Sequence, residues 1–433
     1  MRRARERERE REQEPEHDTV KTSFDAVVVG AGPAGASAAI LLARAGWSVA
    51  LVERQRFPRR KVCGECIAAS NLPMLDALGI GPEFARLAGF ELRRVALMRG
   101  SETIFAPLPA AEAAIHQYGR ALGREHLDTL LANQAEAAGA TLLQPWSLQA
   151  IEGEAGRFRL RVQPVGESGA ARLLEAGLVV AAHGSWEPLP SERALLRRAR
   201  KPSDLFAFKA NFRAASIPAD LLPVLSFDGG YGGMVVADDG LATLACCIRE
   251  DRLERDREAI PGERAGSVVE AILRRECAGV AAALEGASRE GAWLATGPIR
   301  PGVRLGAKDG VFRVGNAAGE AHPIVGEGIS MALQSAFVLA ALVGPEREAL
   351  VATSTAAAAQ ARLLRAYESR WRQRFAQRLR IAAAFAHVAM SPWAASVAWP
   401  VARRWPGLLT HGARWSGKTR CAPEAAQLAA LAA

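Results

Sequence analysis

Residues 24–53 read FDAVVVGAGPAGASAAILLARAGWSVALVE, and this stretch decides the fold. Its apolar, β-branched start predicts a strand buried in a parallel sheet. A turn with the spacing G-x-G-x-x-G follows, formed by Gly30, Gly32 and Gly35. In such a turn the first glycine permits the tight bend, the second lets a pyrophosphate approach the backbone, and the third lets a helix pack closely on the sheet.

The Ala-rich run after the turn predicts a helix, whose N-terminus offers free N–H groups and a partial positive charge to phosphates. A second apolar strand ends at Glu53, which lies 18 residues after Gly35. A carboxylate that binds a ribose 2′-hydroxyl is expected at about this distance, roughly 20 residues on. The stretch therefore predicts a dinucleotide site, and an ordinary βαβ unit with a glycine turn is the alternative.

Length and composition limit the remaining choices. A chain of 433 residues can form two or three domains with a large core. Six cysteines do not indicate a disulfide framework, so we expect a reducing, cytoplasmic setting. The net charge is +9, but no zinc-finger, homeodomain or aromatic-basic RNA motif accompanies it, so nucleic-acid binding is not expected. The start of the chain lacks the apolar core of a signal peptide or membrane anchor, and its alternating Arg and Glu predict a disordered arm.

The C-terminal region combines charge with an uncharged stretch. Glu368 is the only acid among seven arginines, namely Arg362, Arg365, Arg370, Arg372, Arg374, Arg378 and Arg380. Residues 381–402 contain no Asp, Glu, Lys or Arg but contain two prolines. We expect short helices packed on the body rather than a membrane span. The arginines predict either a solvated helix face or a surface for an anionic membrane or an acidic carrier protein, with peripheral contact at the inner membrane surface as the corresponding location.

Hydrophobic periodicity divides the chain into interleaved parts. We expect helices over residues 71–87, 124–138 and 328–342 and from about 355, where Leu364, Tyr367, Trp371, Phe375 and Leu379 form one core-facing stripe. Strands are expected within 90–118, 157–182 and 205–249 and near 311. The predicted fold class is α/β with an α+β insert: a discontinuous nucleotide domain, a β-rich substrate domain and C-terminal helices. The predicted boundaries are a charged arm at 1–21, the nucleotide domain at 22–90, 119–185 and 295–345, the substrate domain at 91–118 and 186–294, and helices at 346–433.

Several separated motifs resemble one enzyme superfamily. Ala39 and Gly46 extend the glycine pattern, and Lys61-Val-Cys63-Gly64-Glu65 resembles a basic Lys-x-Cys-Gly-Glu turn. Arg124 and Asp128 resemble an Arg-xxx-Asp helix start, and residues 315–319 and 323–329 resemble two flavin motifs. Together they resemble the FAD-dependent oxidoreductases related to p-hydroxybenzoate hydroxylase, within the geranylgeranyl-reductase-like and flavin-halogenase-like branch.

This resemblance implies an FAD-binding Rossmann-like domain and assigns roles to residues. Glu53 would hold the adenosine ribose, Arg124 would lie near the phosphates and ribityl chain, and Asn316 would bond the ribityl hydroxyls. Two positions depart from the family pattern, because Asn316 and His183 stand where Asp is usual. The implied cofactor-binding set is Gly30, Gly32, Pro33, Ala34, Gly35, Glu53, Arg54, Lys61, Arg124, Gly315, Asn316, Gly326, Gly328 and Ile329.

The resemblance leaves the reaction open. An NADH- or NADPH- and O2-using monooxygenase acting on an aromatic or polyketide-type substrate, free or carrier-tethered, ranks first. Reduction of alkene bonds in an isoprenoid lipid ranks second, because only Tyr231 remains of that branch's Tyr-x-Trp-x-Phe-Pro. The halogenase pattern Trp-x-Trp-x-Ile-Pro is absent. The alternative from another functional class is a flavin-binding protein that catalyses no reaction.

Three residues are candidates for catalysis: His322 as a proton shuttle, Tyr231 as a substrate-orienting group and Cys63 beside the flavin. Each also has a purely structural interpretation. His322 would be a packed loop residue, Tyr231 a residue in the core of a strand, and Cys63 part of a turn. Cys63 and Cys66 form a C-x-x-C that could be a redox dithiol if its thiol pKa is lowered. We expect no metal site, since no second ligand pair suits zinc.

Overall fold

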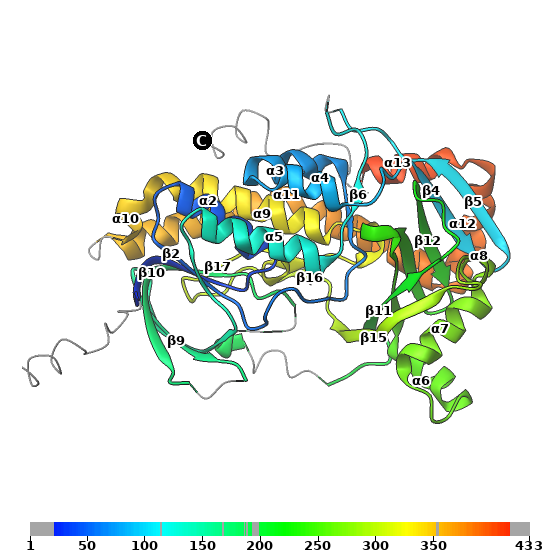
Figure 1. The fold of residues 1–433 in the computed structure, drawn as a ribbon, viewed down its shortest axis with the longest axis horizontal. Coiled ribbons are helices and arrows are strands. Elements are labelled where there is room, and N and C mark those ends of the chain that lie inside the picture. The colour runs from blue at the N-terminus through cyan, green and yellow to red at the C-terminus, as the bar shows by residue number, and fades with distance from the viewer. Residues whose placement is uncertain are drawn as a thin grey trace, which may run out of the picture.

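A computed structural model describes residues 21–112, 115–166, 169–185, 187, 189–192, 199–351 and 355–415. The predicted charged arm at 1–21 lies outside these residues except for Lys21. The fold is of the predicted mixed class, with two separate seven-stranded sheets and helices around them (Figure 1).

The first sheet forms around the strand that opens the glycine pattern. β1 (Ser23–Val29) runs parallel to β2 on one side and to β10 on the other. β17 pairs in parallel with β10, with Val180 opposite Phe312, so the strand near residue 311 lies in this sheet as predicted. The strand order is β7-β2-β1-β10-β9-β8, with β2 at Val49–Val52, β7 at Thr141–Leu143, β8 at Trp146–Glu154, β9 at Arg157–Pro164, β10 at Arg172–Ala181 and β17 at Phe312–Arg313.

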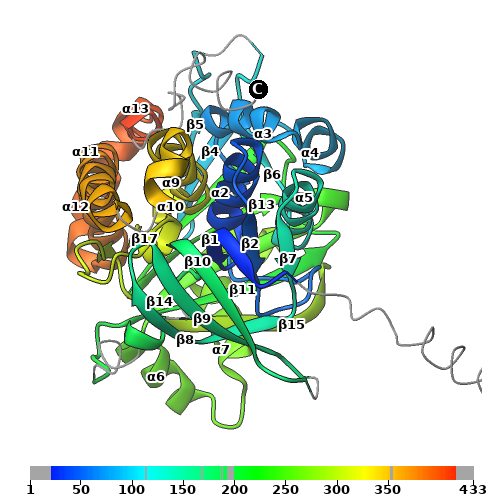
Figure 2. The ribbon, with the colours of Figure 1, turned by 90° about the vertical axis from the view of Figure 1, so that its left-hand side faces the viewer.

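Helices cover one face of this sheet. Its β8–β9 hairpin curves beneath the parallel strands (Figure 2). α2 (Pro33–Arg44) packs between α5 (Arg124–Ala137) and α9 (Gly328–Val343). A close helix–strand contact requires glycine at position 35, because a Cβ there would lie 1.8 Å from the Gly30 carbonyl oxygen. The third glycine of the pattern therefore has the packing role that the sequence predicted.

The second sheet forms the other half of the molecule. Its strand order is β15-β11-β14-β13-β12-β4-β5. Its strands are β4 (Arg94–Arg99), β5 (Glu102–Pro107), β11 (Leu205–Arg213), β12 (Leu221–Phe227), β13 (Gly230–Val236), β14 (Ala242–Arg249) and β15 (Ser288–Ile299). One face packs in a separate core on three helices that the sequence interpretation missed, α6 (Glu250–Ala259), α7 (Ala265–Glu276) and α8 (Ala278–Ala283).

Two predicted helical features need correction. The helix expected over 71–87 is two helices, α3 (Leu72–Leu78) and α4 (Gly81–Leu87), because Gly79 adopts a left-handed φ of +87° between them. In the C-terminal stripe, Leu363 is buried while Leu364 is half-buried, so Leu363 replaces Leu364 as the core residue. The short pairs β3 (Cys66–Ile67) with β6 (Arg120–Ala121) and β16 (Gly302–Val303) with β18 (Gly319–Glu320) complete the strands.

The C-terminal helices connect the two halves. α10 (Arg347–Val351) precedes α11 (Ala356–Met390), which is 35 residues long. The chain then bends by 100° into α12 (Pro392–Arg404), and α13 (Gly407–Trp415) follows. Among the described residues, the stretch Gly328–Val351 is long and apolar enough to cross a membrane, but 78% of its most apolar window is buried, as in a core helix.

Candidate functional site

Glu53 lies where the strand ends of the first sheet meet the glycine turn. Its side chain is 5% exposed. One carboxylate oxygen accepts a hydrogen bond from the Ala31 backbone N–H at 2.9 Å, and the other accepts from the Gln55 N–H at 2.9 Å. These bonds fix the carboxylate at the carboxyl edge of β2, beside the turn, where the sequence predicted a ribose ligand.

Two basic side chains border the turn. Arg124, the first residue of α5, donates two hydrogen bonds to Asp128, at 2.8 and 2.7 Å. Burial opposes the charge of Arg124, but the Asp128 carboxylate more than offsets it, so the pKa of the guanidinium is raised. Burial, together with the charges of Arg124 and Arg59, lowers the pKa of Lys61 to about 8. The site thus concentrates positive charge, and a bound anion would offset the repulsion between these cations.

The two predicted flavin motifs form a loop at the N-terminus of α9. Asn316 donates through Nδ2 to the Ser185 hydroxyl at 2.9 Å, and Ser185 donates onward to Glu320 at 2.7 Å. The Gly315 N–H donates to Ser335 at 2.8 Å. Gly326 has a φ of +63°, and α9 begins two residues later, so the positive end of a 16-residue helix faces this loop.

Two cavities meet at the glycine turn. The first, which we call the chamber, has a volume of about 460 Å³, and the second has a volume of about 500 Å³. Gly30 and Arg54 line the second cavity, next to His183. The chamber takes the other side of the turn and is lined there by Gly32, Pro33, Ala34, Lys61, Arg124, Gly315, Asn316, Gly326, Gly328 and Ile329.

This arrangement fits an extended dinucleotide. A Cβ at Gly32 would meet only the Arg124 guanidinium, at 3.6 Å, and a Cβ at Gly328 would meet nothing within 4 Å, so both backbones are open to a ligand. The pyrophosphate would cross the turn, with the adenosine in the second cavity and the flavin in the chamber. Burial lowers the pKa of His183 to about 4, so this residue is neutral where the family pattern has an acid. Arg54 is largely exposed and lies 3.7 Å from Glu187.

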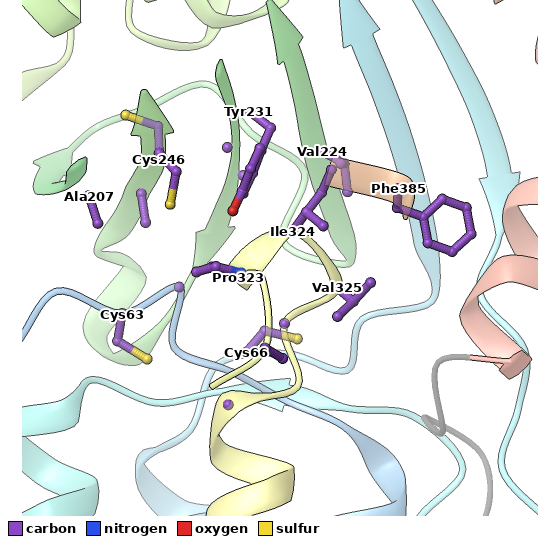
Figure 3. A pocket seen from close by; sticks show the side chains of 18 of the residues that line it. Cys63, Cys66, Ala207, Val224, Tyr231, Cys246, Pro323, Ile324, Val325 and Phe385 are labelled. Carbon is purple, nitrogen blue, oxygen red and sulfur yellow. The ribbon is translucent and has the colours of Figure 1, made fainter. Parts of the chain in front are cut away.

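Two of the three catalytic candidates lie at the chamber (Figure 3). Tyr231 and Cys63 both line it, and Tyr231 points toward the loop that carries Pro323 and Ile324. The Tyr231 hydroxyl lies 3.3 Å from Nδ1 of His322, which is not among the residues that line the chamber. Burial raises the pKa of Tyr231 and lowers that of His322. At neutral pH the pair is therefore a protonated phenol beside a neutral imidazole, so the Tyr231 hydroxyl can donate a hydrogen bond to Nδ1 of His322.

The C-x-x-C turn is held by residues that the sequence interpretation missed. Cys63 and Cys66 form no disulfide, and the same holds for the other cysteines of the described chain. Between them, Glu65 adopts a left-handed φ of 57° and is 1% exposed. Its carboxylate accepts hydrogen bonds from Lys209, Thr243 and the Arg124 N–H. No local pattern indicates these contacts, although a lysine inside the apolar run of β11 is an unusual residue that could have been noted.

The far end of the chamber is apolar. It passes between β4, β12 and β13 of the second sheet and the C-terminal helices. Its walls there are Val95, Leu97, Leu108, Leu222, Val224, Met234, Phe385, Val388, Ala395, Ala398, Trp399, Ala402, Leu408 and Leu409. Such a wall suits a long hydrocarbon chain. Within the described part of the chain, no group of three or more His, Cys, Asp or Glu side chains could hold a metal ion.

Comparisons with known proteins agree with this geometry. A family model described as FAD binding domain matches residues 23–382. Menaquinone reductase of Mycobacterium tuberculosis is 34% identical over 139 residues, which are 32% of this chain and 33% of that protein. The aligned part thus spans about a third of that relative. Digeranylgeranylglycerophospholipid reductase 2 of Methanopyrus kandleri is 28% identical over 83% of this chain and 85% of its own length.

Among solved structures, the flavin-dependent brominase Bmp2 superposes with a TM-score of 0.70. The superposition covers 95% of this chain and 97% of the brominase, at 17% sequence identity. At that identity the likeness concerns the fold alone.

Proposed function

Because the chain belongs to the FAD-binding-domain family and is a flavin-dependent oxidoreductase, we propose that it uses NADH or NADPH and O2 to hydroxylate the aromatic ring of a substrate that carries a long apolar chain. Bound FAD would supply two-electron transfer from the nicotinamide and activation of O2. A reaction that uses NAD(P)H would take place in the cytoplasm. The observation that carries the proposal is the chamber, which has the Tyr231 hydroxyl in its wall, 3.3 Å from His322, and an apolar lining at its far end.

The chain's own residues would bind and orient the reactants. Glu53 would accept the ribose hydroxyls, and Lys61 with Arg124 would balance the phosphate charge. The N-terminus of α9 would stabilise negative charge on the flavin ring. In the chamber, the Tyr231 hydroxyl would orient a phenolic substrate by accepting a hydrogen bond from the substrate hydroxyl while donating its own to Nδ1 of His322. A phenol that donates such a hydrogen bond has a ring richer in electrons, which would favour attack on an electrophilic oxygen.

Alkene reduction is the second candidate. It is favoured by the alignment with a digeranylgeranylglycerophospholipid reductase over most of the chain and by the presence of Cys63 and Gly64 in the chamber wall. In that reaction Tyr231 would donate a proton to the substrate. Hydroxylation and alkene reduction would both use the apolar far end of the chamber, so this region does not distinguish the two reactions.

One experiment separates the two. The purified flavoprotein is given NADH or NADPH in air with long-chain and short-chain phenols and isotopically labelled O2. We expect the long-chain phenol to stimulate nicotinamide oxidation and the label to enter the product. In a parallel anaerobic reaction, a polyprenyl lipid is offered with chemically reduced enzyme. Loss of a double bond there, without oxygenation in air, would replace the first candidate by the second.

A further inference from the structure

The last described helices carry an apolar stripe that faces away from the protein. On α12 and its C-cap, side-chain positions four residues apart lie on one face. Those on the outward face are Trp393, Val397, Val401 and Trp405, which are 77%, 57%, 41% and 58% exposed. Trp415, at the end of α13, is 70% exposed. Contiguous exposed apolar side chains of this kind mark an interaction surface.

The opposite face of α12 is already in use. Ala395, Ala398, Trp399 and Ala402 line the chamber. The outward stripe therefore does not serve the chamber, and no described part of the chain buries it. The helix has apolar residues on both faces, one toward the substrate channel and one toward solvent.

Charge identifies the chemistry of the surface that would cover the stripe. From Ser369 to Trp415 the sequence contains no Asp or Glu, and it contains eight arginines: Arg370, Arg372, Arg374, Arg378, Arg380, Arg403, Arg404 and Arg414. Arg404 lies over the ring of Trp405, 5.9 Å from its centroid, and Arg414 precedes Trp415. Tryptophan and arginine together are typical of helices that lie in the interface of an anionic membrane.

Not all of these arginines are available to a partner. Arg378 donates to Gln334 at 3.0 Å and lies 3.7 Å from Glu327, and its side chain is only 17% exposed. Arg372 pairs with Glu368 at 3.2 Å. The docking surface is therefore centred on α12 and α13 rather than on the arginine-rich part of α11.

The helices that carry the stripe are held in place. Glu102 on β5 accepts hydrogen bonds from the indole N–H of Trp399 and from Arg403, the latter at 3.1 Å. The Thr410 hydroxyl donates to the Pro107 carbonyl at 2.7 Å. The stripe is thus a formed surface, and docking does not need to order it first.

We propose that the outward faces of α12 and α13 dock on an anionic lipid bilayer, with the indole rings of Trp393, Trp405 and Trp415 at the level of the headgroups. The chamber wall formed by Trp399, Leu408 and Leu409 lies directly behind this surface. Docking would place the apolar far end of the chamber against the hydrocarbon core of the bilayer. An apolar substrate could then pass from the bilayer into the chamber. A second copy of the chain fits less well, because it would bring the same arginine-rich face and the same net charge of +9.

The test measures binding of the full-length holoprotein to vesicles by sedimentation. Vesicles of phosphatidylcholine alone are compared with vesicles that also contain phosphatidylglycerol, at low and high salt. We expect binding to the anionic vesicles that weakens as salt rises. The triple substitution Trp393→Ser, Val397→Ser and Trp405→Ser should weaken that binding at least about tenfold.

A matched control is Leu173→Ser on β10, which removes a 46% exposed apolar side chain from the first sheet and should leave vesicle binding unchanged. Flavin content and melting temperature should be the same in all variants, which separates loss of docking from loss of fold. Oxidation of a detergent-dispersed phenol should also be unaffected by the triple substitution, so docking and the proposed reaction can fail independently.

Three results would overturn the proposal. One is the absence of sedimentation with anionic vesicles at low salt. Another is undiminished sedimentation of the triple variant. The third is a wild-type dimer in solution that the triple substitution converts to a monomer, which would assign the stripe to an interface between copies of this chain.

Discussion

Glu65 and Lys209, 144 residues apart in the sequence, form an ion pair that is closed to solvent. The two side chains are 1% and 0% exposed, and the pair connects the C-x-x-C turn to β11. Burial raises the pKa of Glu65, and the Lys209 charge and the hydrogen bond from Thr243 oppose that rise. A turn that lines the chamber is thereby fixed to the second sheet.

Replacing Lys209 by Met should be strongly destabilising, because it leaves a buried carboxylate without its cation. Breaking such a pair costs about 3–5 kcal/mol, measured here as the free energy of unfolding in urea. In this variant the pKa of Glu65 should rise further, so the folded state binds a proton more tightly than the unfolded chain does. The difference in the free energy of unfolding between the wild type and the variant should therefore become smaller as the pH is lowered toward the pKa of an ordinary glutamate. The control is Arg94→Met, which removes an exposed pair with Asp220 and should change stability little.

Glu53→Gln should weaken FAD binding. The substitution keeps the size of the side chain but removes the charge that accepts the ribose hydroxyls. The loss is about 1–3 kcal/mol, or roughly 5-fold to 150-fold in affinity. Titration of the apoprotein with FAD, followed by flavin fluorescence, measures the change. Glu152→Gln on β8, which is exposed, is the matched control. Equal affinities for all three proteins would exclude Glu53 from the cofactor site.

Lys61 should make FAD binding pH-dependent. Its pKa is about 8 in the free protein, and the cofactor's phosphates should raise that value in the complex. A pKa raised on binding means that affinity is full below about pH 8 and falls as the pH rises above it. FAD titrations across this range should show the decline in the wild type and a flat profile in Lys61→Gln. A wild-type profile as flat as that of the variant would contradict the assignment.

Tyr231→Phe should lower turnover of a phenolic substrate while leaving flavin content unchanged, since it removes the hydroxyl that links the chamber to His322. Because burial lowers the pKa of His322, activity should be retained below the usual histidine value of about 6.5 before acid abolishes it. His322→Asn should remove that acid limb. Tyr118→Phe changes a tyrosine outside the chamber lining and should have no effect on turnover or on its pH profile.

The sequence predicted the parts of the site that local chemistry specifies. The glycine turn, Glu53 and the loop at 315–328 depend on residues close together in the chain. The structure places the turn and the loop at two adjoining cavities, and Glu53, which lines neither cavity, is bonded to the turn through the Ala31 N–H. The pair of Glu65 and Lys209 was missed because its contacts cross 144 residues, and no pattern within one element reports them.

The missed helices include one that could have been recognised. α7 has apolar residues at Val268, Val269, Ile272 and Leu273, which is a helical spacing. The short helices expected over residues 381–402 are present in part, as α12, but the sequence did not indicate their bounds, since α12 presents apolar residues both to the chamber and to solvent and so lacks a one-sided pattern. The domain boundaries and the NAD(P)H donor stay predictions.

α11 has a consequence for how a substrate can reach the chamber. Near its start, the Tyr367 hydroxyl donates to the Arg313 carbonyl in the first sheet at 2.7 Å. Near its end, the Ala389 carbonyl accepts from Ser226 in the second sheet at 2.8 Å. The single helix α11, about 50 Å long, is thus hydrogen-bonded to both halves. Separating the two halves would require α11 to bend or its hydrogen bonds to break, so a substrate is expected to enter at the end of the chamber bordered by α12 and α13, without separation of the halves.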